Sequence, residues 1–437
     1  MDSKRRRFLA TALAGVAGAA ALGVWRGWPD EGFFNPCRAP LPPELAQHPL
    51  VRDAWAGLDA TRVWDAHAHL LGVGDAGATL AGDGAGFNDG DGTLRWPIAA
   101  AQRAFFLNAA CVNAPGIDAA YAARLRAHVD VMPPGYKLLL LALDRWHDDA
   151  GLARADRTHA WVGNHYCAAV AKSAPARFEW AASVHPYRND ALAELARLHA
   201  LGARAVKWIP SAQGIDPASP RCDRFYETLV RLDLPLITHA GTERAAPGDD
   251  ALGNPLRLRR ALDHDVRVVV AHCASMGRGR DLDAGPDGPW VDNFALFERL
   301  MGQPRYAGLL FGDLSALTQS ARAGAPLRRV LERADNDWKG RLLNGSDYPL
   351  PGIMPLYSTR ALAADGLLPA AAVEPLAAIR QYNPMLYDFV LKRHLHAGIR
   401  SLPASVFETR TFFEPGTLSV LQGSASSPTG SPDARRP

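Results

Sequence analysis

The stretch VWDAHAHLLG, residues 63–72, places two histidines at the end of a short apolar run. The run has the composition of a buried β-strand, in which residues i and i+2 point to the same face. His67 and His69 are therefore expected to project together, just before Gly72. Two converging imidazoles can hold a divalent metal such as Zn²⁺. A hydrogen-bonded pair of core or surface histidines is the alternative that this stretch alone leaves open.

Seven more apolar runs follow along the chain, and helical patterns alternate with them. The eight runs are 63–69, 136–144, 178–187, 203–210, 235–241, 266–274, 309–316 and 342–349. Between them, residues 189–202, 222–233 and 254–265 carry apolar residues at helical spacing. Alternating strands and helices indicate a parallel sheet. Eight such strands predict a closed barrel.

The predicted fold class is therefore α/β, a single (β/α)8 TIM barrel with a long insertion after the first strand. An open doubly wound sheet is the competing fold, and it would normally show a GxGxxG turn after the first strand, which is absent here. The insertion contains GDGAGFNDGDGT, residues 82–93. Its acidic spacing does not fit an EF-hand, so we expect a flexible loop near the active site.

Polar residues end several of the later runs, as the histidines end the first. They are Lys207, His239, His272 and Asp347. The steps from 207 to 239 and from 239 to 272 are 32 and 33 residues, one strand-helix unit each, which predicts one common height at the barrel mouth. Each residue alone also fits a structural role: a capped charge, a core histidine or a helix N-cap. Together with His67 and His69, they predict a single site.

Three other residues lie on the predicted barrel strands. His185 and Asp313 lie on barrel strands and could join the site, but structural hydrogen bonding is the role we expect for them. Trp208 follows Lys207 directly, so its side chain should point the opposite way and pack outside the barrel.

The two ends of the chain differ from the middle. Residues 1–25 combine Arg5-Arg6-Arg7-Phe8-Leu9 with an Ala- and Gly-rich apolar stretch, the layout of a twin-arginine export signal or of a retained membrane anchor. Residues 26–50 are expected to be a linker, 51–400 the barrel, and 401–437 an extension with a disordered tail. We therefore expect a periplasmic or otherwise exported protein, with membrane contact only through an uncleaved leader.

Charge and cysteine content restrict the partners. The net charge is +3, and the first seven residues alone contribute four basic minus one acidic, or +3. The remainder is close to neutral, so no basic surface for nucleic acid is expected. The five cysteines at 37, 111, 167, 222 and 273 show no readable disulfide framework; one bridge is possible, but its partners cannot be assigned. A small-molecule substrate is the expected partner, and the oligomeric state stays open.

Several motifs together resemble the amidohydrolase superfamily, and within it the amidohydrolase-2 branch. The matching pieces are D-A-H-A-H (65–69), V-K (206–207), T-H (238–239), A-H (271–272), G-S-D-Y-P (345–349) and YNPMLYDF (382–389), the last resembling a terminal helix that opens with an asparagine. The resemblance spans about residues 60–392. It implies a metal-dependent barrel with one or two divalent ions, such as Zn²⁺.

The resemblance also implies a role for each residue. His67, His69 and Asp347 would hold a first metal, with His239 as a further ligand. His272 would bind a second metal or act as an acid/base, and Lys207 would be a carboxylated bridge between two ions or a group that binds substrate charge. Asp347 would take the proton of the metal-activated water and pass it to the leaving group.

Three functions remain open at this stage. A metal-dependent hydrolase is the leading hypothesis, and a metal-dependent lyase (a decarboxylase or hydratase) shares its ligands. The third is an exported, non-catalytic binding protein with a degenerate barrel. The complete ligand set argues against it, because an inactive site has no physical reason to keep all of its ligands. The sequence does not identify the substrate.

Overall fold

The structure is a computed structural model that describes residues 31–75, 84–87, 96–112 and 115–414. The predicted leader, the tail beyond residue 414 and most of the 82–93 stretch lie outside the described residues. Within that stretch, Ala85–Phe87 forms β2, which pairs antiparallel with β4 (Ala160–Val162).

Eight short parallel strands form the centre of the molecule. They are β1 (Trp64–His69), β3 (Lys137–Leu141), β5 (Phe178–Ala181), β6 (Val206–Trp208), β7 (Leu236–His239), β8 (Val268–Ala271), β11 (Leu310–Asp313) and β12 (Leu342–Leu343). Their hydrogen bonds give two sheets, in the orders β1-β3-β5 and β12-β11-β8-β7-β6.

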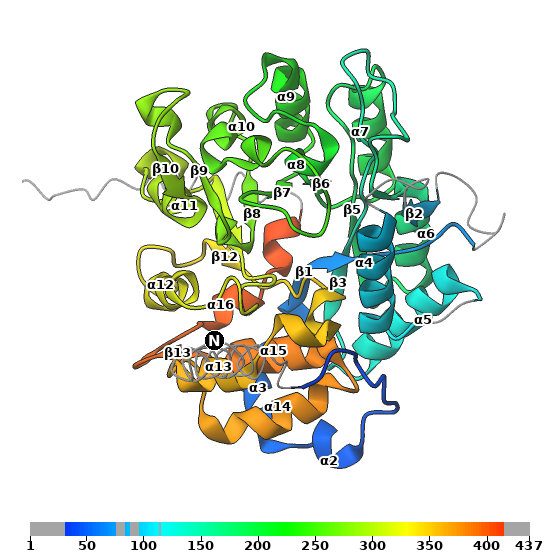
Figure 1. The fold of residues 1–437 in the computed structure, drawn as a ribbon, viewed down its shortest axis with the longest axis vertical. Coiled ribbons are helices and arrows are strands. Elements are labelled where there is room, and N and C mark those ends of the chain that lie inside the picture. Colours follow the sequence, from blue (N-terminus) through cyan, green and yellow to red (C-terminus); the bar gives the residue numbers. More distant parts are fainter. Residues whose placement is uncertain (1–30, 76–83, 88–95, 113–114, 415–437) are drawn as a thin grey trace, which may run out of the picture.

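Backbone hydrogen bonds join these two sheets at both seams. Between β5 and β6, Lys207 N donates to Ala182 O over 2.7 Å. Between β1 and the segment that continues β12, His69 N donates to Tyr348 O over 2.8 Å. The eight strands thus follow one another around a ring, which is visible in Figure 1. The predicted (β/α)8 barrel is confirmed.

The strands are shorter than the apolar runs suggested, because several runs leave the sheet before they end. The run 266–274 forms a strand only as far as Ala271, and His272, Cys273 and Ala274 then adopt left-handed φ angles of 55°, 51° and 50°. Asp347 also has a positive φ, of 60°. Prediction of the strand ends was wrong here because apolar composition does not record where a buried chain turns.

Helices surround the barrel on its outside (Figure 1). The main ones are α5 (Ile117–Asp130), α6 (Asn164–Ser173), α7 (Ala191–Ala200), α9 (Asp223–Arg231), α10 (Arg259–Asp263), α11 (Asn293–Met301), α12 (Ala325–Arg333), α14 (Val373–Arg380) and α15 (Pro384–His394). Helices α7, α9 and α10 occupy the three ranges with predicted helical spacing. The terminal helix α15 begins at the expected asparagine, since the side chain of Asn383 accepts the N–H groups of Met385 and Leu386.

The insertion after β1 contains β2, α4 (Trp96–Ala109) and α5. A disulfide joins Cys111, just beyond α4, to Cys37 in the segment that was expected to be a linker. That segment also contains α2 (Pro43–Ala46) and the start of α3 (Pro49–Trp55), and Trp55 stacks on Phe389 of α15 at 4.3 Å. Residues 31–55 are therefore attached to the barrel. Cys167, Cys222 and Cys273 are buried thiols.

Further short strands were not anticipated from the sequence. β9 (Arg278–Arg280) pairs antiparallel with β10 (Trp290–Asp292), and β13 (His396–Ala397) pairs with β14 (Arg400–Ser401). Both pairs lie outside the barrel ring.

The interior of the barrel is a compact apolar floor. It consists of Trp64, Ala66, Leu139, Leu141, Ala181, Ala205, Ile237, Val269, Phe311 and Leu343 from the strand runs, with Phe412 and Phe413. Phe412 packs against Phe311 at 4.7 Å, and Phe413 stacks on Trp64 at 6.1 Å. The two rings follow α16 (Ala404–Phe407), so residues from the predicted extension complete the core.

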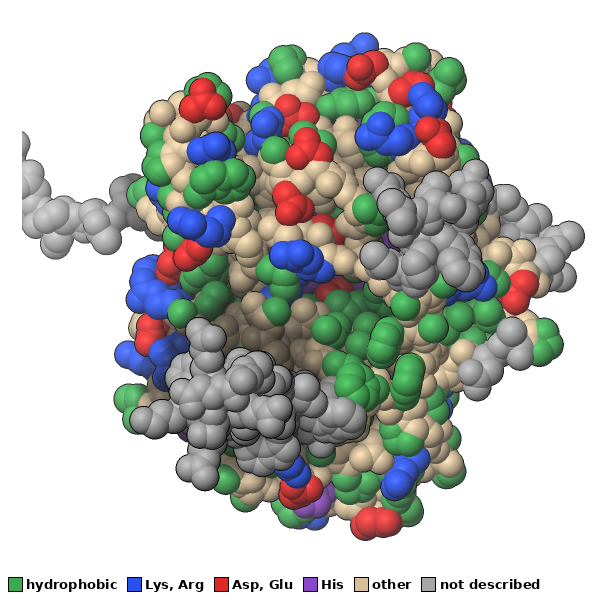
Figure 2. Space-filling view, in the orientation of Figure 1, with side chains coloured by type: hydrophobic (Ala, Val, Ile, Leu, Met, Phe, Trp, Pro, Cys, Tyr) green, Lys and Arg blue, Asp and Glu red, His purple; other side chains and the backbone are tan. Residues whose placement is uncertain are grey.

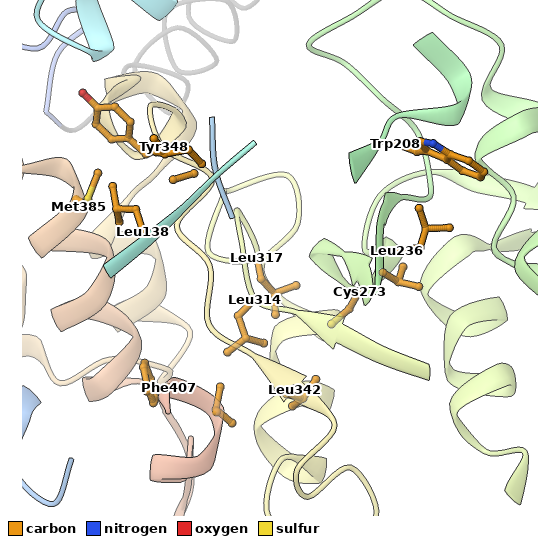
Figure 3. Packing of buried hydrophobic residues seen from close by; sticks show 14 of the residues in the cluster. Leu138, Trp208, Leu236, Cys273, Leu314, Leu317, Leu342, Tyr348, Met385 and Phe407 are labelled. Atoms are coloured by element: carbon orange, nitrogen blue, oxygen red, sulfur yellow. The ribbon is translucent and has the colours of Figure 1, made fainter. Parts of the chain in front are cut away.

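A second apolar layer lies between the strands and the helices. Figure 3 shows part of it, with Trp208 on the outer side of its strand. The Trp208 ring lies 5.0 Å from Phe225 of α9, and its Nε1 donates to Val184 O over 2.9 Å. The predicted outward orientation of Trp208 is confirmed.

We expect Phe413→Ala to lower the free energy of unfolding by about 3–5 kcal/mol, because it removes a large buried ring and leaves a cavity in the floor. Ile399→Ala is the control, since Ile399 is 97% exposed and its truncation should change stability by less than about 0.5 kcal/mol. Denaturant midpoints measure both. Equal midpoints for the two variants would show that the phenyl ring does not close the floor.

Candidate metal centre

A change of phase in β1 brings both histidines to the barrel mouth. Trp64 and Ala66 face the apolar floor, and the pairing of β1 with β3 then shifts register between Asp65 and Ala68. After this bulge, His67 and His69 lie on the inner side, with their ring centroids 5.1 Å apart. The bulge thus converts an apolar strand into one that ends in two inward imidazoles.

Asp347 meets these histidines from the eighth strand. Its Oδ1 lies 3.0 Å from His69 Nε2 and 3.5 Å from His67 Nε2. One donor atom from each of the three residues falls within 4.8 Å of the other two, so a single ion could contact all three. Burial alone would raise the pKa of Asp347, but His272, His69 and His67 hold that pKa well below its usual value. The carboxylate is therefore ionised.

Lys207 reaches the same point from β6. Its Nζ lies 2.9 Å from His67 Nε2, and the side chain is buried. Burial lowers the pKa of Lys207 to about 8, although Asp313 and Asp347 act in the opposite direction. Part of this lysine is therefore a neutral amine near neutral pH, which is the form that reacts or ligates.

His239 ends β7 and lies beside His272, with their ring centroids 5.3 Å apart. Its Nδ1 is 3.2 Å from Glu243 Oε2, whereas its buried Nε2 has no hydrogen-bond partner among the described residues. A carboxylate on one ring nitrogen fixes the tautomer and leaves the other nitrogen ready to ligate. His239 is not part of the 4.8 Å group and stands next to it.

His272 turns into the site from the loop after β8. Its Nδ1 lies 2.8 Å from both the carbonyl oxygen and Oγ of Ser315, and its Nε2 lies 3.8 Å from Asp347 Oδ2. Burial, with Arg322 next in effect, lowers the pKa of His272 well below its usual value. The imidazole is therefore neutral and can accept a proton or a metal at Nε2.

Asp313 supports two of these histidines, through the ring of His67 and the backbone of His272. Its Oδ2 lies 2.8 Å from His67 Nδ1, and its Oδ1 accepts the backbone N–H groups of His272 (2.9 Å) and Ser315 (3.0 Å). Burial lowers the pKa of His67 to about 4, although Asp313 opposes this shift. Asp313 thus makes the structural hydrogen bonds that were expected of it.

Asp65 supports the site from outside the barrel. Its Oδ1 accepts the N–H groups of His67 over 3.0 Å and of Ser346 over 2.8 Å, which ties the bulge to the loop that carries Asp347. Nearby, Lys392 of α15 donates to Gly345 O over 2.5 Å and to Asp388 Oδ2 over 2.6 Å. Burial raises the pKa of Asp65 to about 6.

The structure thus brings together the six predicted residues and keeps His185 apart from them. His185 Nε2 contacts Gln213 O at 3.0 Å, and its ring lies 4.8 Å from that of His147. Sequence reasoning missed Glu243, Ser315 and Arg322. Glu243 lies four residues after His239 and Ser315 two after Asp313, which is the only signal that could have indicated them.

Access to the site is from the His69 side. The His69 side chain is 23% exposed, whereas those of His67, His272 and Asp347 are 5% exposed or less. Figure 2 shows a shaded hollow near the centre of the face that Figure 1 displays, with hydrophobic side chains gathered beside it.

The residues present fit a divalent metal. Imidazole nitrogens and a carboxylate are the donors that ions such as Zn²⁺ and Mn²⁺ take from proteins. The unpartnered His239 Nε2 is a buried nitrogen that a metal would satisfy. Asp313 and Glu243 hold the far nitrogens of His67 and His239, as supporting groups of ligating histidines do.

Comparison with solved structures finds similar chains of low identity. A putative 2-pyrone-4,6-dicarboxylic acid hydrolase from Pseudomonas putida is 18% identical, covering 80% of this chain and 97% of its own, with a TM-score of 0.41. A 5-carboxyvanillate decarboxylase from Sphingomonas paucimobilis is 13% identical, covering 83% and 98%, with a TM-score of 0.44.

A 5-carboxyvanillate decarboxylase from Novosphingobium aromaticivorans, solved with bound manganese, is 13% identical, covering 80% of this chain and 96% of its own, with a TM-score of 0.41. A search of curated proteins gives no match. The family model described as Amidohydrolase matches residues 64–384, and this range includes all six predicted site residues. The chain belongs to this amidohydrolase family.

Proposed function

We propose that the protein is a metal-dependent hydrolase that acts on a small organic substrate. The observation that carries this proposal is the convergence of His67, His69 and Asp347 within 4.8 Å at the C-terminal end of the barrel strands, where catalytic sites of such barrels lie. His239 would complete the set around a first divalent ion. Lys207 and His272 would hold a second ion between them.

A divalent ion held there supplies Lewis acidity, which makes water nucleophilic near neutral pH and polarises a substrate oxygen. The chain itself handles the protons. Asp347 is held in its ionised form and belongs to the group that would hold the ion, so this carboxylate would take a proton from the attacking water. Its Oδ2 lies 3.8 Å from His272 Nε2. The same carboxylate returns the proton to the leaving group, and the neutral His272 beside it can share the transfer.

A metal-dependent lyase remains the second candidate, because decarboxylation or hydration would use the same ligands and the same acid/base pair. Isotope-labelled water separates the reactions. A hydrolase places labelled oxygen on one product of a cleaved bond, a hydratase adds it without cleavage, and a decarboxylase releases carbon dioxide and leaves no label at the cleaved carbon. Lactones, amides, phosphoesters and aromatic acids form the first substrate panel.

We expect His67→Ala to lose bound metal and activity together, with activity falling at least about 100-fold, since loss of a ligand should exceed the effect of losing a supporting residue. Metal content per chain and turnover of the best substrate from the panel are the measurements. His48→Ala is the control: His48 caps α3 far from the mouth, and its loss should leave both values unchanged. Full metal content in His67→Ala would reject the site.

We expect Lys207→Ala to lower the metal content from two ions to one per chain, because Lys207 would help to hold the second ion, whereas His67, His69, Asp347 and His239 would still hold the first. His67→Ala, by contrast, disturbs the first. A wild-type protein that binds a single ion, or a Lys207→Ala variant that keeps two, would contradict the two-metal arrangement and leave a one-metal site.

We also propose that the chain is exported. The support is the twin-arginine pattern at residues 5–9 and the Cys37–Cys111 disulfide, because disulfides persist mainly in oxidising compartments. Within the described part of the chain, no helix combines the length and apolar character that crossing a bilayer requires.

Replacing Arg5 and Arg6 together by Lys should retain the protein in the cytoplasm, because the arginine pair is recognised by a receptor and equal charge does not substitute for it. Cell fractionation followed by immunoblotting measures the outcome. Wild-type protein in the cytoplasmic fraction would reject export, and an exported double-lysine variant would show that the pair is not the signal.

A further inference from the structure

Arg322 is a buried cation beside the metal centre. It lies in the loop between β11 and α12, nine residues after Asp313, and its side chain is among the buried ones, at 5% exposure. Its Nε and Nη1 have no hydrogen-bond partner among the described residues. Burying these two N–H groups without acceptors is costly, since buried charges are normally paired.

The other buried arginines do not share this feature. Arg267 donates to Phe412 O and Asp233, Arg341 donates to Leu310 O and Met301 O, and Arg380 donates to Pro351 O and Ile353 O. Each of these side chains links segments of the fold. Arg322 links none through its Nε or Nη1, so a structural role does not explain its burial.

The carboxylates around Arg322 are already engaged. Glu243, the strongest of its charged neighbours, contacts His239 Nδ1 with Oε2 and accepts the Ala245 N–H with Oε1 over 2.6 Å. Both oxygens of Asp313 hold the His67 and His272 segments. Asp347 belongs to the metal group. Arg322 therefore lies in the field of three anions without a carboxylate of its own.

The loop that carries Arg322 is held in place by backbone hydrogen bonds. Arg322 N donates to Gln319 O over 2.8 Å, and Gln319 N donates to Ala316 O over 3.0 Å. Ser320 N donates to Leu356 O over 2.9 Å, which fixes the loop to the segment beyond the eighth strand. These bonds fix the backbone of the loop from which the Arg322 side chain extends.

We propose that Arg322 binds a carboxylate group of the substrate and so selects a small organic acid for the metal centre. The planar guanidinium offers two parallel N–H donors, which match the two oxygens of a carboxylate. This proposal rests on the proposed function, since it places the substrate beside the metal. It adds the chemical class of the substrate and the residue that recognises it.

The test is calorimetric binding to the metal-loaded protein. The probes are acetate, butyrate and benzoate, each paired with its neutral amide of the same shape, and inorganic phosphate. We expect the wild type to bind at least one acid more tightly than the matching amide. Arg322→Met should weaken the binding of that acid by about 10- to 100-fold, the usual range for the loss of hydrogen bonds to a charged group. The affinity for the matching amide should not change. Arg322→Lys should restore part of the difference.

Stability and metal content separate recognition from folding. Arg322→Met should keep the wild-type metal content and melting temperature, whereas Arg341→Met should melt at a lower temperature because its partners are left unsatisfied. Arg305→Gln is the surface control, since the Arg305 side chain is 60% exposed, and its acid binding should equal that of the wild type.

Three results would overturn the proposal. In the first, the wild type prefers none of the three acids over its amide. In the second, the Arg322→Met variant binds the acid as tightly as the wild type does. In the third, phosphate binds more tightly than every acid, and this binding depends on Arg322. A wild type without bound metal would instead reject the proposed function. The role of Arg322 would still be decided by whether the preference for acid over amide is smaller in Arg322→Met than in the wild type.

Discussion

The hydrogen bonds that the Asp65 carboxylate accepts from the His67 and Ser346 N–H groups are the interaction on which the site depends. Below the bulge, β1 presents Trp64 and Ala66 to an apolar floor, and above it the same strand presents two imidazoles. A bulge leaves an N–H group outside the sheet ladder, and a buried N–H without an acceptor is unfavourable. Asp65 accepts it and, through Ser346, sets the position of Asp347 relative to both histidines.

The polar groups above the floor then satisfy one another in a chain of contacts. Asp313 joins His67 to the His272 loop, Ser315 bridges the two rings, and Glu243 orients His239. Burial of these carboxylates disfavours their charged form, and imidazole, hydroxyl and backbone donors around them favour it. Within this paired group, His239 Nε2 and the Nε and Nη1 of Arg322 are buried without a partner among the described residues, which makes them candidate contacts for a metal or a substrate.

Sequence patterns predicted the parts of the molecule that depend on local periodicity. The eight apolar runs gave the strand order, the i, i+2 spacing placed His67 and His69 on one face, and alternation placed Trp208 outside. The repeat of one strand-helix unit identified Lys207, His239 and His272, and the end of the eighth run identified Asp347. Strand ends, the Cys37–Cys111 pairing, Glu243, Ser315 and Arg322 escaped prediction, because each depends on neighbours that only the folded chain brings close. The bulge in β1 was equally invisible, since a register shift does not change the order of residues.

The aromatic floor also has a consequence for the order of events in biosynthesis. Chains are made from the N-terminus, and domains generally fold as units once their residues have emerged. Trp64 is among the first barrel residues to emerge, yet its partner Phe413 follows only after every strand has been made. A nascent chain that already holds all eight strands therefore still exposes the lower surface of its core. Completion of the barrel floor therefore comes after all eight strands have been made, and a product truncated before residue 412 would present an open aromatic cavity to chaperones and proteases.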